Sequence, residues 1–177
     1  DPSDNWYIYK YTVNGKEVES YWSNRQGIDK GEPSKLTYAF HVLIGHHGIF
    51  SLTPVWLLSM AGIWMWFRST DTTRRELAIG IAAMTVICLV FYIAFRPQDD
   101  RNYGGMTSGF RWMFWFTPLW ILTMIPAADR LARSVRGQVF AAVLLSFSVL
   151  SASYPTWNPW VHPWLYNWMV ECGLPKF

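Results

Sequence analysis

The sequence predicts an all-α integral membrane protein, a four-span helical bundle with an N-terminal β-hairpin on its outer face and a Trp-rich interfacial C-terminal tail. First, 51% of the 177 residues are hydrophobic and only 15% are charged, against roughly 25% charged in an average soluble domain. Second, four nearly chargeless segments fill the last two thirds of the chain. Third, two short loops between them are rich in arginine. A mean hydropathy of +0.09 hides this pattern, because it averages a polar first third with an apolar remainder.

The four predicted spans are Ile49–Phe67, Glu76–Phe95, Phe110–Ala128 and Val139–Tyr154. A helix of roughly 20 residues crosses a hydrocarbon core of about 30 Å. The second and third segments fit this length, whereas the fourth is short and would need local thinning of the bilayer. A short helix from Leu36 to Ile44 leads into the first. The alternative of four buried helices in a soluble core is disfavoured, because too little polar surface remains to coat it.

The first forty residues are polar and aromatic and predict a hairpin. Strands are expected near Tyr7–Val13 and Lys16–Trp22, because β-rich residues flank Asn14-Gly15, the strongest short hairpin signal. Ser23–Lys35 is expected to be a loop. The predicted division is an outer-face polar segment at 1–40, a membrane bundle at 41–155 and an interfacial tail at 156–177.

Arginine placement predicts the orientation in the membrane. The loop after the first span and the loop after the third hold six arginines, against three in and beside the loop between the second and third spans. Short basic loops stay in the cytoplasm. The hairpin, the Arg96–Arg111 loop and both termini are then expected on the outer, periplasmic side of a bacterial inner membrane. The tail is expected to lie along that interface, because indole rings favour the headgroup zone; its tryptophans are Trp157, Trp160, Trp164 and Trp168.

His46 and His47 form the first candidate ligand-binding cluster, between Gly45 and Gly48. Adjacent histidines at a membrane entrance could bind a metal, a phosphate or a sugar hydroxyl. Neighbouring side chains do not share one helical face, so a metal would require a loop geometry, which the glycines allow. A polar or substrate-contacting role is favoured over metal ligation, and no metal and no cofactor are expected. A weaker reading is a metal or redox subunit that uses all four histidines, His41, His46, His47 and His162.

Arg111 is the second candidate, at the end of the glycine-rich stretch that begins Tyr103-Gly104-Gly105. An arginine at membrane depth usually has a partner or a function. Glycines let a ligand approach the backbone, and the following helix N-terminus favours an anion. A phosphate contact is therefore one interpretation. The other is an arginine that extends to the outer headgroups.

The remaining groups indicate no chemistry of their own. Asp99, Asp100 and Arg101 read as a solvated loop, and the aromatic residues of the hairpin could either stack on sugar rings or pack on the outer domain. Two cysteines make neither a disulfide framework nor a zinc site. A net charge of +3 is too small to indicate nucleic acid. No known nucleophile, nucleotide-binding or metalloprotease motif is present, so the catalytic residues are unknown.

The stretch Tyr103-Gly-Gly-Met-Thr-Ser-Gly-Phe-Arg-Trp112, with the following Phe114-Trp-Phe-Thr-Pro-Leu119, resembles the C-terminal half of polytopic membrane glycosyltransferases. The type is that of the dolichyl-phosphate-mannose protein mannosyltransferases. Gly45-His-His-Gly-Ile-Phe-Ser-Leu-Thr-Pro54 resembles a segment of similar bacterial membrane proteins. The likeness covers residues 36–126.

The resemblance implies a multi-span enzyme that uses a polyprenyl-phosphate-linked sugar as donor at the outer membrane face, with Arg111 contacting the lipid phosphate. In that family the catalytic acid lies in the first outer loop, upstream of the region matched here. The chain is then expected to be the C-terminal portion of an enzyme, bound to the lipid bilayer and to the sugar lipid. The alternative is a non-catalytic membrane subunit that packs against partner subunits through its aromatic outer surface.

Overall fold

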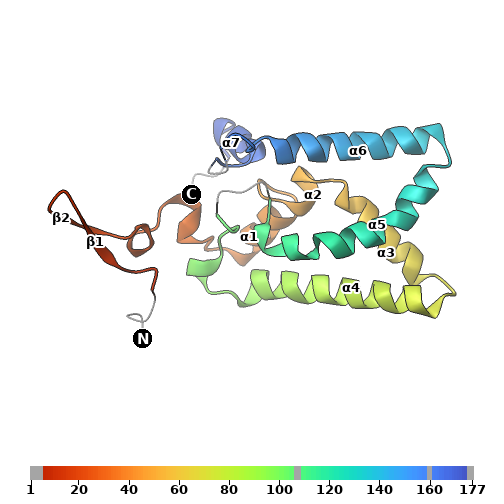
Figure 1. Ribbon diagram of the computed structural model, residues 1–177, viewed down its shortest axis with the longest axis horizontal. Coiled ribbons are helices and arrows are strands. Elements are labelled where there is room, and N and C mark those ends of the chain that lie inside the picture. The colour runs from red at the N-terminus through yellow and green to blue at the C-terminus, as the bar shows by residue number, and fades with distance from the viewer. Residues whose placement is uncertain (1–5, 106–108, 159–160, 175–177) are drawn as a thin grey trace.

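The computed structural model describes residues 6–105, 109–158 and 161–174, and this part of the chain is mostly helical (Figure 1). It contains seven α-helices and one two-stranded sheet, so the predicted helical class and the predicted hairpin are confirmed. The helices are α1 (Lys35–Leu43), α2 (Ile49–Leu52), α3 (Trp56–Phe67), α4 (Thr72–Val90), α5 (Thr117–Leu131), α6 (Val135–Ser153) and α7 (Trp164–Glu171).

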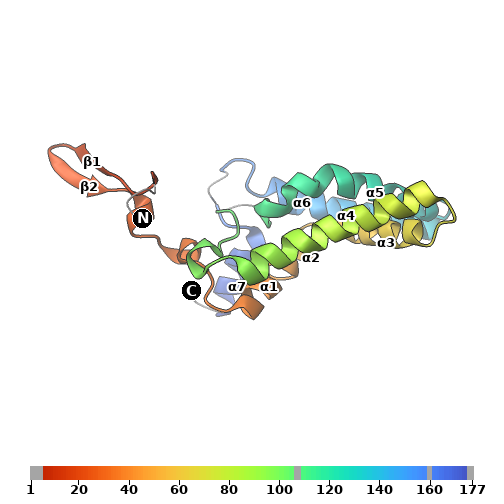
Figure 2. The ribbon, with the colours of Figure 1, turned by 90° about the horizontal axis from the view of Figure 1, so that it is seen from below.

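Four helices run side by side along the long axis of the molecule (Figures 1 and 2). Helices α3 and α5 form the middle, with α4 on one flank and α6 on the other (Figure 1). The turns that join α3 to α4 and α5 to α6 lie at one end of this bundle. Helices α1, α2 and α7 gather at the opposite end, and the hairpin projects beyond them. The two arginine-rich loops therefore share one end of the bundle, and the glycine-rich stretch lies at the other.

The hairpin is shorter than its sequence suggests. Strand β1 (Lys10–Val13) pairs antiparallel with β2 (Lys16–Glu19). Asn14 and Gly15 have φ of 51° and 75°, the pair of positive values that a two-residue type I′ turn requires. The second strand ends early because Tyr21–Ser23 turns into a 3-10 helix.

Two of the four predicted spans are interrupted. Pro54 separates α2 from α3, since proline restricts the preceding residue to extended conformations and lacks an N–H. Ahead of α5, Arg111–Phe116 winds as a 3-10 helix. The fourth span is longer than expected, because the Ser134 hydroxyl accepts a hydrogen bond from the Gly137 N–H at 3.1 Å and starts α6 at Val135.

Two helices of the described residues are long and apolar enough to cross a membrane, judged by length and composition. They are Thr72–Phe95 with 24 residues, formed by α4 and a π-helical turn at Phe91–Phe95, and Val135–Ser153 with 19. Trp56–Phe67 is apolar but shorter.

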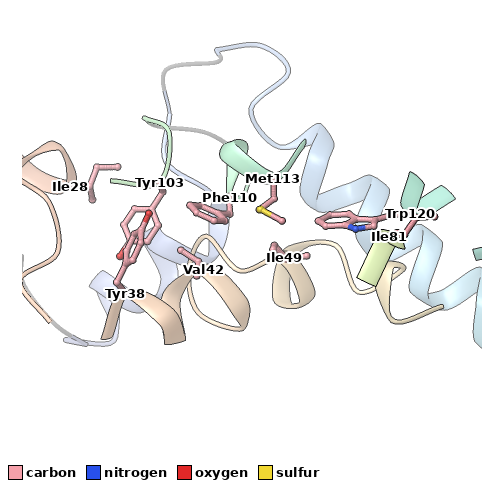
Figure 3. Close-up of a cluster of buried hydrophobic side chains, with 9 residues drawn as sticks. All are labelled: Ile28, Tyr38, Val42, Ile49, Ile81, Tyr103, Phe110, Met113 and Trp120. Atoms are coloured by element: carbon pink, nitrogen blue, oxygen red, sulfur yellow. The ribbon is translucent and has the colours of Figure 1, made fainter. Parts of the chain in front are cut away.

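Small and hydroxyl-bearing residues bring the helices together. At Gly62 a side chain would overlap the Thr123 carbonyl of α5. The Ser59 hydroxyl donates to the Trp120 carbonyl at 2.7 Å, and the Trp120 indole donates to Thr85 of α4 at 3.1 Å. Such contacts are typical of helix packing in membranes. The buried core extends from the end of the bundle that bears the hairpin, at Ile28, into the bundle at Trp120 (Figure 3).

Candidate functional site

Four histidines from three separate segments gather at the end of the bundle that bears the hairpin. His41 lies in the last turn of α1, His46 and His47 lie in the loop before α2, and His162 precedes α7. The rings of His41 and His46 stack with centroids 3.8 Å apart, and one Nδ1 of the His46–His47 pair donates to the other. His47 also meets His162 edge to face at 6.5 Å between centroids. The predicted adjacent pair is thus the centre of a larger buried cluster.

The local sequence explains this loop. The Ser34 hydroxyl accepts from the Thr37 N–H at 3.2 Å and caps the start of α1. The Gly45 N–H donates to the Phe40 carbonyl at 2.8 Å and closes its end. A side chain at Gly45 would overlap the His41 ring, so glycine is needed for the chain to turn back beneath it.

Tyr103, which begins the glycine-rich stretch, packs directly on these histidines. The Tyr103 ring stacks on His47 with centroids 4.4 Å apart and planes 14° apart. Behind it, the Tyr38 hydroxyl donates to the Asn102 carbonyl at 2.6 Å and the Gly104 N–H donates to the Asn102 side chain at 3.0 Å. The first bond ties this loop to α1, and the second fixes the local turn at Gly104.

Arg111 closes the same stretch from its other side. Its N–H donates to the Tyr103 carbonyl at 3.3 Å. Gly104 and Gly105 have φ of 89° and 87°, and a Cβ at Gly104 would lie 2.7 Å from the Cβ of Arg111. Glycine therefore allows the arginine to cross over the loop, while its side chain remains exposed. The structure brings the six candidate ligand-binding residues, His46, His47, Tyr103, Gly104, Gly105 and Arg111, to one end of the bundle.

Burial keeps the histidine cluster uncharged at neutral pH. Desolvation lowers the pKa of His41 to about 4 and that of His46 to about 3, where the other histidines add repulsion. The pKa of His47 is lowered well below its usual value for the same reasons. Burial also raises the pKa of the Tyr103 hydroxyl, with Glu32 adding to the effect. These groups are therefore suited to neutral hydrogen bonding rather than to holding an anion.

Two buried acids lie beside the cluster, and sequence reasoning missed them. Asp29 accepts a hydrogen bond from the Tyr21 hydroxyl at 2.9 Å, and Glu32 accepts from the Ser34 N–H at 3.3 Å. Both residues are 9% exposed or less. Both lie in the segment Ser23–Lys35, which was expected to be a loop. A 3-10 helix at Gly27–Lys30 buries Asp29 together with Ile28, and Glu32 follows two residues after this helix.

A second missed group surrounds Trp112. The guanidinium carbons of Arg96 and Arg111 each lie 5.6 Å from the centroid of its ring. Tyr92 stacks on the same indole at 5.9 Å, and Arg96 forms an ion pair with Asp100 at 3.5 Å. No sequence signal links Arg96 to Arg111, because fourteen residues lie between them in the chain.

The structure also bears on metal ligation and on the tryptophans of the C-terminal tail. Within the described ranges, no group of three or more His, Cys, Asp or Glu side chains is placed to hold a metal ion. Trp157 of the tail is almost fully exposed and the Trp164 indole donates to Ser151 of α6 at 2.9 Å. Trp160 lies outside the described residues.

Comparison with known proteins gives no relative: no protein-family model, curated protein or solved structure matches this chain. The resemblance to membrane glycosyltransferases therefore depends on the motif residues alone, and the function has to be argued from the geometry of the site.

Proposed function

We propose that this chain is a four-span membrane module, the C-terminal portion of a glycosyltransferase-like protein, that binds a polyprenyl-phosphate-linked sugar at the outer membrane face. The observation that carries the proposal is the position of Arg111. Its exposed guanidinium lies over a glycine turn, beside a cluster of neutral hydrogen-bonding rings, at the end of an otherwise apolar bundle.

The flanks of the bundle support a membrane location. Only 11% of the apolar stretch in α4 with its π-helical turn, and 17% of that in α6, is buried within the protein. Large side chains such as Ile87 and Leu150 are more than half exposed. Exposed apolar surface of this extent is unfavourable in water and favourable in lipid. In this proposal, α2 with α3, and Arg111–Phe116 with α5, form the other two spans, because they cross the bundle obliquely between α4 and α6 and reach the same end (Figure 1).

The distribution of arginine supports the orientation. The end of the bundle with the two tight turns carries six arginines in and beside those turns. Under the positive-inside rule this end stays in the cytoplasm. Arg111, the histidine cluster, the hairpin and α7 then lie on the outer side.

The chemistry at that end suits an amphipathic phosphate ester. A guanidinium binds phosphate oxygens through charge-assisted, bidentate hydrogen bonds. Phe114 and Trp115 follow within one turn and are exposed, so a prenyl chain could lie along the flank below the phosphate. His46, His47 and Tyr103 offer neutral donors and acceptors of the kind that recognise sugar hydroxyls.

Binding measured in lipid nanodiscs tests this proposal. A polyprenyl-phosphate sugar should bind the wild-type protein, and Arg111→Gln should weaken binding about tenfold to a hundredfold, as expected for the loss of hydrogen bonds from a charged donor. Arg111→Lys should retain part of the affinity. Arg133→Gln, which removes an exposed arginine at the opposite end, is the matched control and should bind normally. Unchanged affinity in Arg111→Gln would refute the phosphate contact.

The hairpin favours a second candidate, a non-catalytic subunit of a larger membrane complex. Every residue of β1 and β2 is exposed, and Tyr9, Tyr11 and Val18 share one face of the ribbon. An isolated two-stranded hairpin is only marginally stable in water. This one also projects away from the bundle (Figure 2), so a partner protein that covers its aromatic face would stabilise it.

A further inference from the structure

The group around Trp112 consists mainly of hydrogen-bond donors that lack acceptors. Among the described residues, the Nε atom of Arg96 and the indole Nε1 of Trp112 are buried and have no hydrogen-bond partner. The Arg111 guanidinium has no hydrogen bond or ion pair within the described ranges. Arginine and indole nitrogens can only donate. A buried donor without an acceptor is costly, so two such donors beside the exposed guanidinium of Arg111 indicate that an acceptor-rich ligand belongs there.

The two arginines are close enough to share one ligand. Each guanidinium carbon lies 5.6 Å from the same indole centroid, so the two carbons are separated by at most twice that distance. Arg96 follows the π-helical turn that ends the long apolar helix, and Arg111 begins the next apolar stretch. Both therefore sit at the same level of the bundle, where a lipid headgroup would lie. Like charges held at one aromatic ring repel each other unless an anion lies between them.

One of the arginines already has a partner, which limits what else it can bind. Arg96 Nη2 pairs with Asp100 Oδ2 at 3.5 Å. This pair leaves Nε and the other Nη free to donate and fixes the side chain beside Tyr92 and Trp112. The ligand therefore has to supply enough negative charge to compete near a carboxylate. Two adjacent phosphates do so, one for each guanidinium.

We infer that Arg96, Trp112 and Arg111 together form a binding site for a diphosphate headgroup, so that the preferred lipid is diphosphate-linked rather than monophosphate-linked. This inference rests on the proposed function, which requires only that Arg111 binds one phosphate. It adds that Arg96 and the Trp112 N–H bind the second.

The test compares polyprenyl monophosphate and polyprenyl diphosphate in nanodiscs containing the whole chain. The wild-type protein should bind the diphosphate at least about tenfold more tightly, the effect expected for one more charge-assisted pair. Arg96→Gln should remove this preference and change monophosphate affinity less than about threefold. Asp100→Asn frees Arg96 and should increase the preference.

The matched control is Arg68→Gln, since Arg68 lies over Trp64 at 4.5 Å in the same kind of cation–π pair at the opposite end of the bundle. It should bind both lipids as the wild type does. Equal binding of the two lipids by the wild type, or equal losses for both in Arg96→Gln, would overturn the inference and leave Arg96 as an interfacial anchor. Failure of the proposed function is recognised separately, because Arg111→Gln would then bind both lipids normally. Inorganic diphosphate should bind far more weakly than the lipid; equal binding would assign the site to the free anion and refute the lipid part.

Discussion

The close crossing of α3 and α5 makes Gly62 the most sensitive glycine of the bundle. A methyl group at this position would overlap the backbone carbonyl of Thr123 and approach Pro126. Backbone cannot rotate away as a side chain can, so Gly62→Ala has to push the helices apart. Overpacking of this kind costs about 1–3 kcal/mol. The displaced helices would also lose the hydrogen bond from Ser59 to the Trp120 carbonyl, worth about 1 kcal/mol.

Gly62→Ala should therefore destabilise the protein by about 2–4 kcal/mol, a decrease of roughly 4–16 °C in the thermal unfolding midpoint for a chain of this size. The midpoint can be followed by tryptophan fluorescence in detergent micelles. Gly80→Ala is the matched control, because nothing lies within 4 Å of a Cβ on that glycine of α4. It should be neutral or stabilise by up to about 1 kcal/mol through helix propensity. If the two variants melt together, the described contact between α3 and α5 is wrong.

Two further predictions concern the end of the bundle that bears the hairpin. Burial lowers the pKa of His41 to about 4 and that of His46 to about 3, so below about pH 6.5 the unfolded chain binds protons that the native chain does not. The stabilising effect of these neutral histidines should be fully present above that pH and should decrease as the pH falls toward 4. A thermal midpoint that stays constant from pH 8 to pH 5 would contradict the buried cluster. The double substitution of Tyr9 and Tyr11 to serine should leave the thermal midpoint unchanged, since both side chains are exposed. It should reduce the amount of any partner complex that co-purifies with the protein. An unchanged amount of co-purified partner would exclude this face of the hairpin as the contact.

The sequence was informative where a signal is local. Asn14-Gly15 predicted the hairpin turn because few other pairs accept positive φ at both positions. The short helix expected from Leu36 to Ile44 is confirmed as α1 within one residue. The second apolar segment appears as α4 with its π-helical turn, because an uninterrupted apolar run has few alternatives to a helix.

Contacts between residues that are distant in the sequence were harder to predict. The predicted span Ile49–Phe67 contains Pro54, which divides it into two helices, since whether neighbours satisfy the carbonyls that a proline frees depends on packing. Sequence reasoning paired His46 with His47 and joined all four histidines only in the weaker metal or redox reading, whereas the turn at Gly45 packs His41 and His46 together beside Tyr103. The sequence contains no pattern that predicts the burial of Asp29 and Glu32 or the contact of Arg96 and Arg111 with one indole, because the residues in contact are distant in the sequence.

The most direct test of the account is the side of the membrane on which each end of the bundle lies. Cys88 would be replaced by alanine and Cys172 by serine. Single cysteines would then be introduced by Thr12→Cys in the hairpin and by Thr70→Cys in the turn between α3 and α4. Both positions are exposed, and a membrane-impermeant maleimide would be applied to intact cells. If Arg111 lies at the outer end of the bundle, the cysteine at 12 should be labelled directly and the cysteine at 70 only after permeabilisation. Equal labelling of both in intact cells would contradict a bundle that crosses the membrane with Arg111 at its outer end.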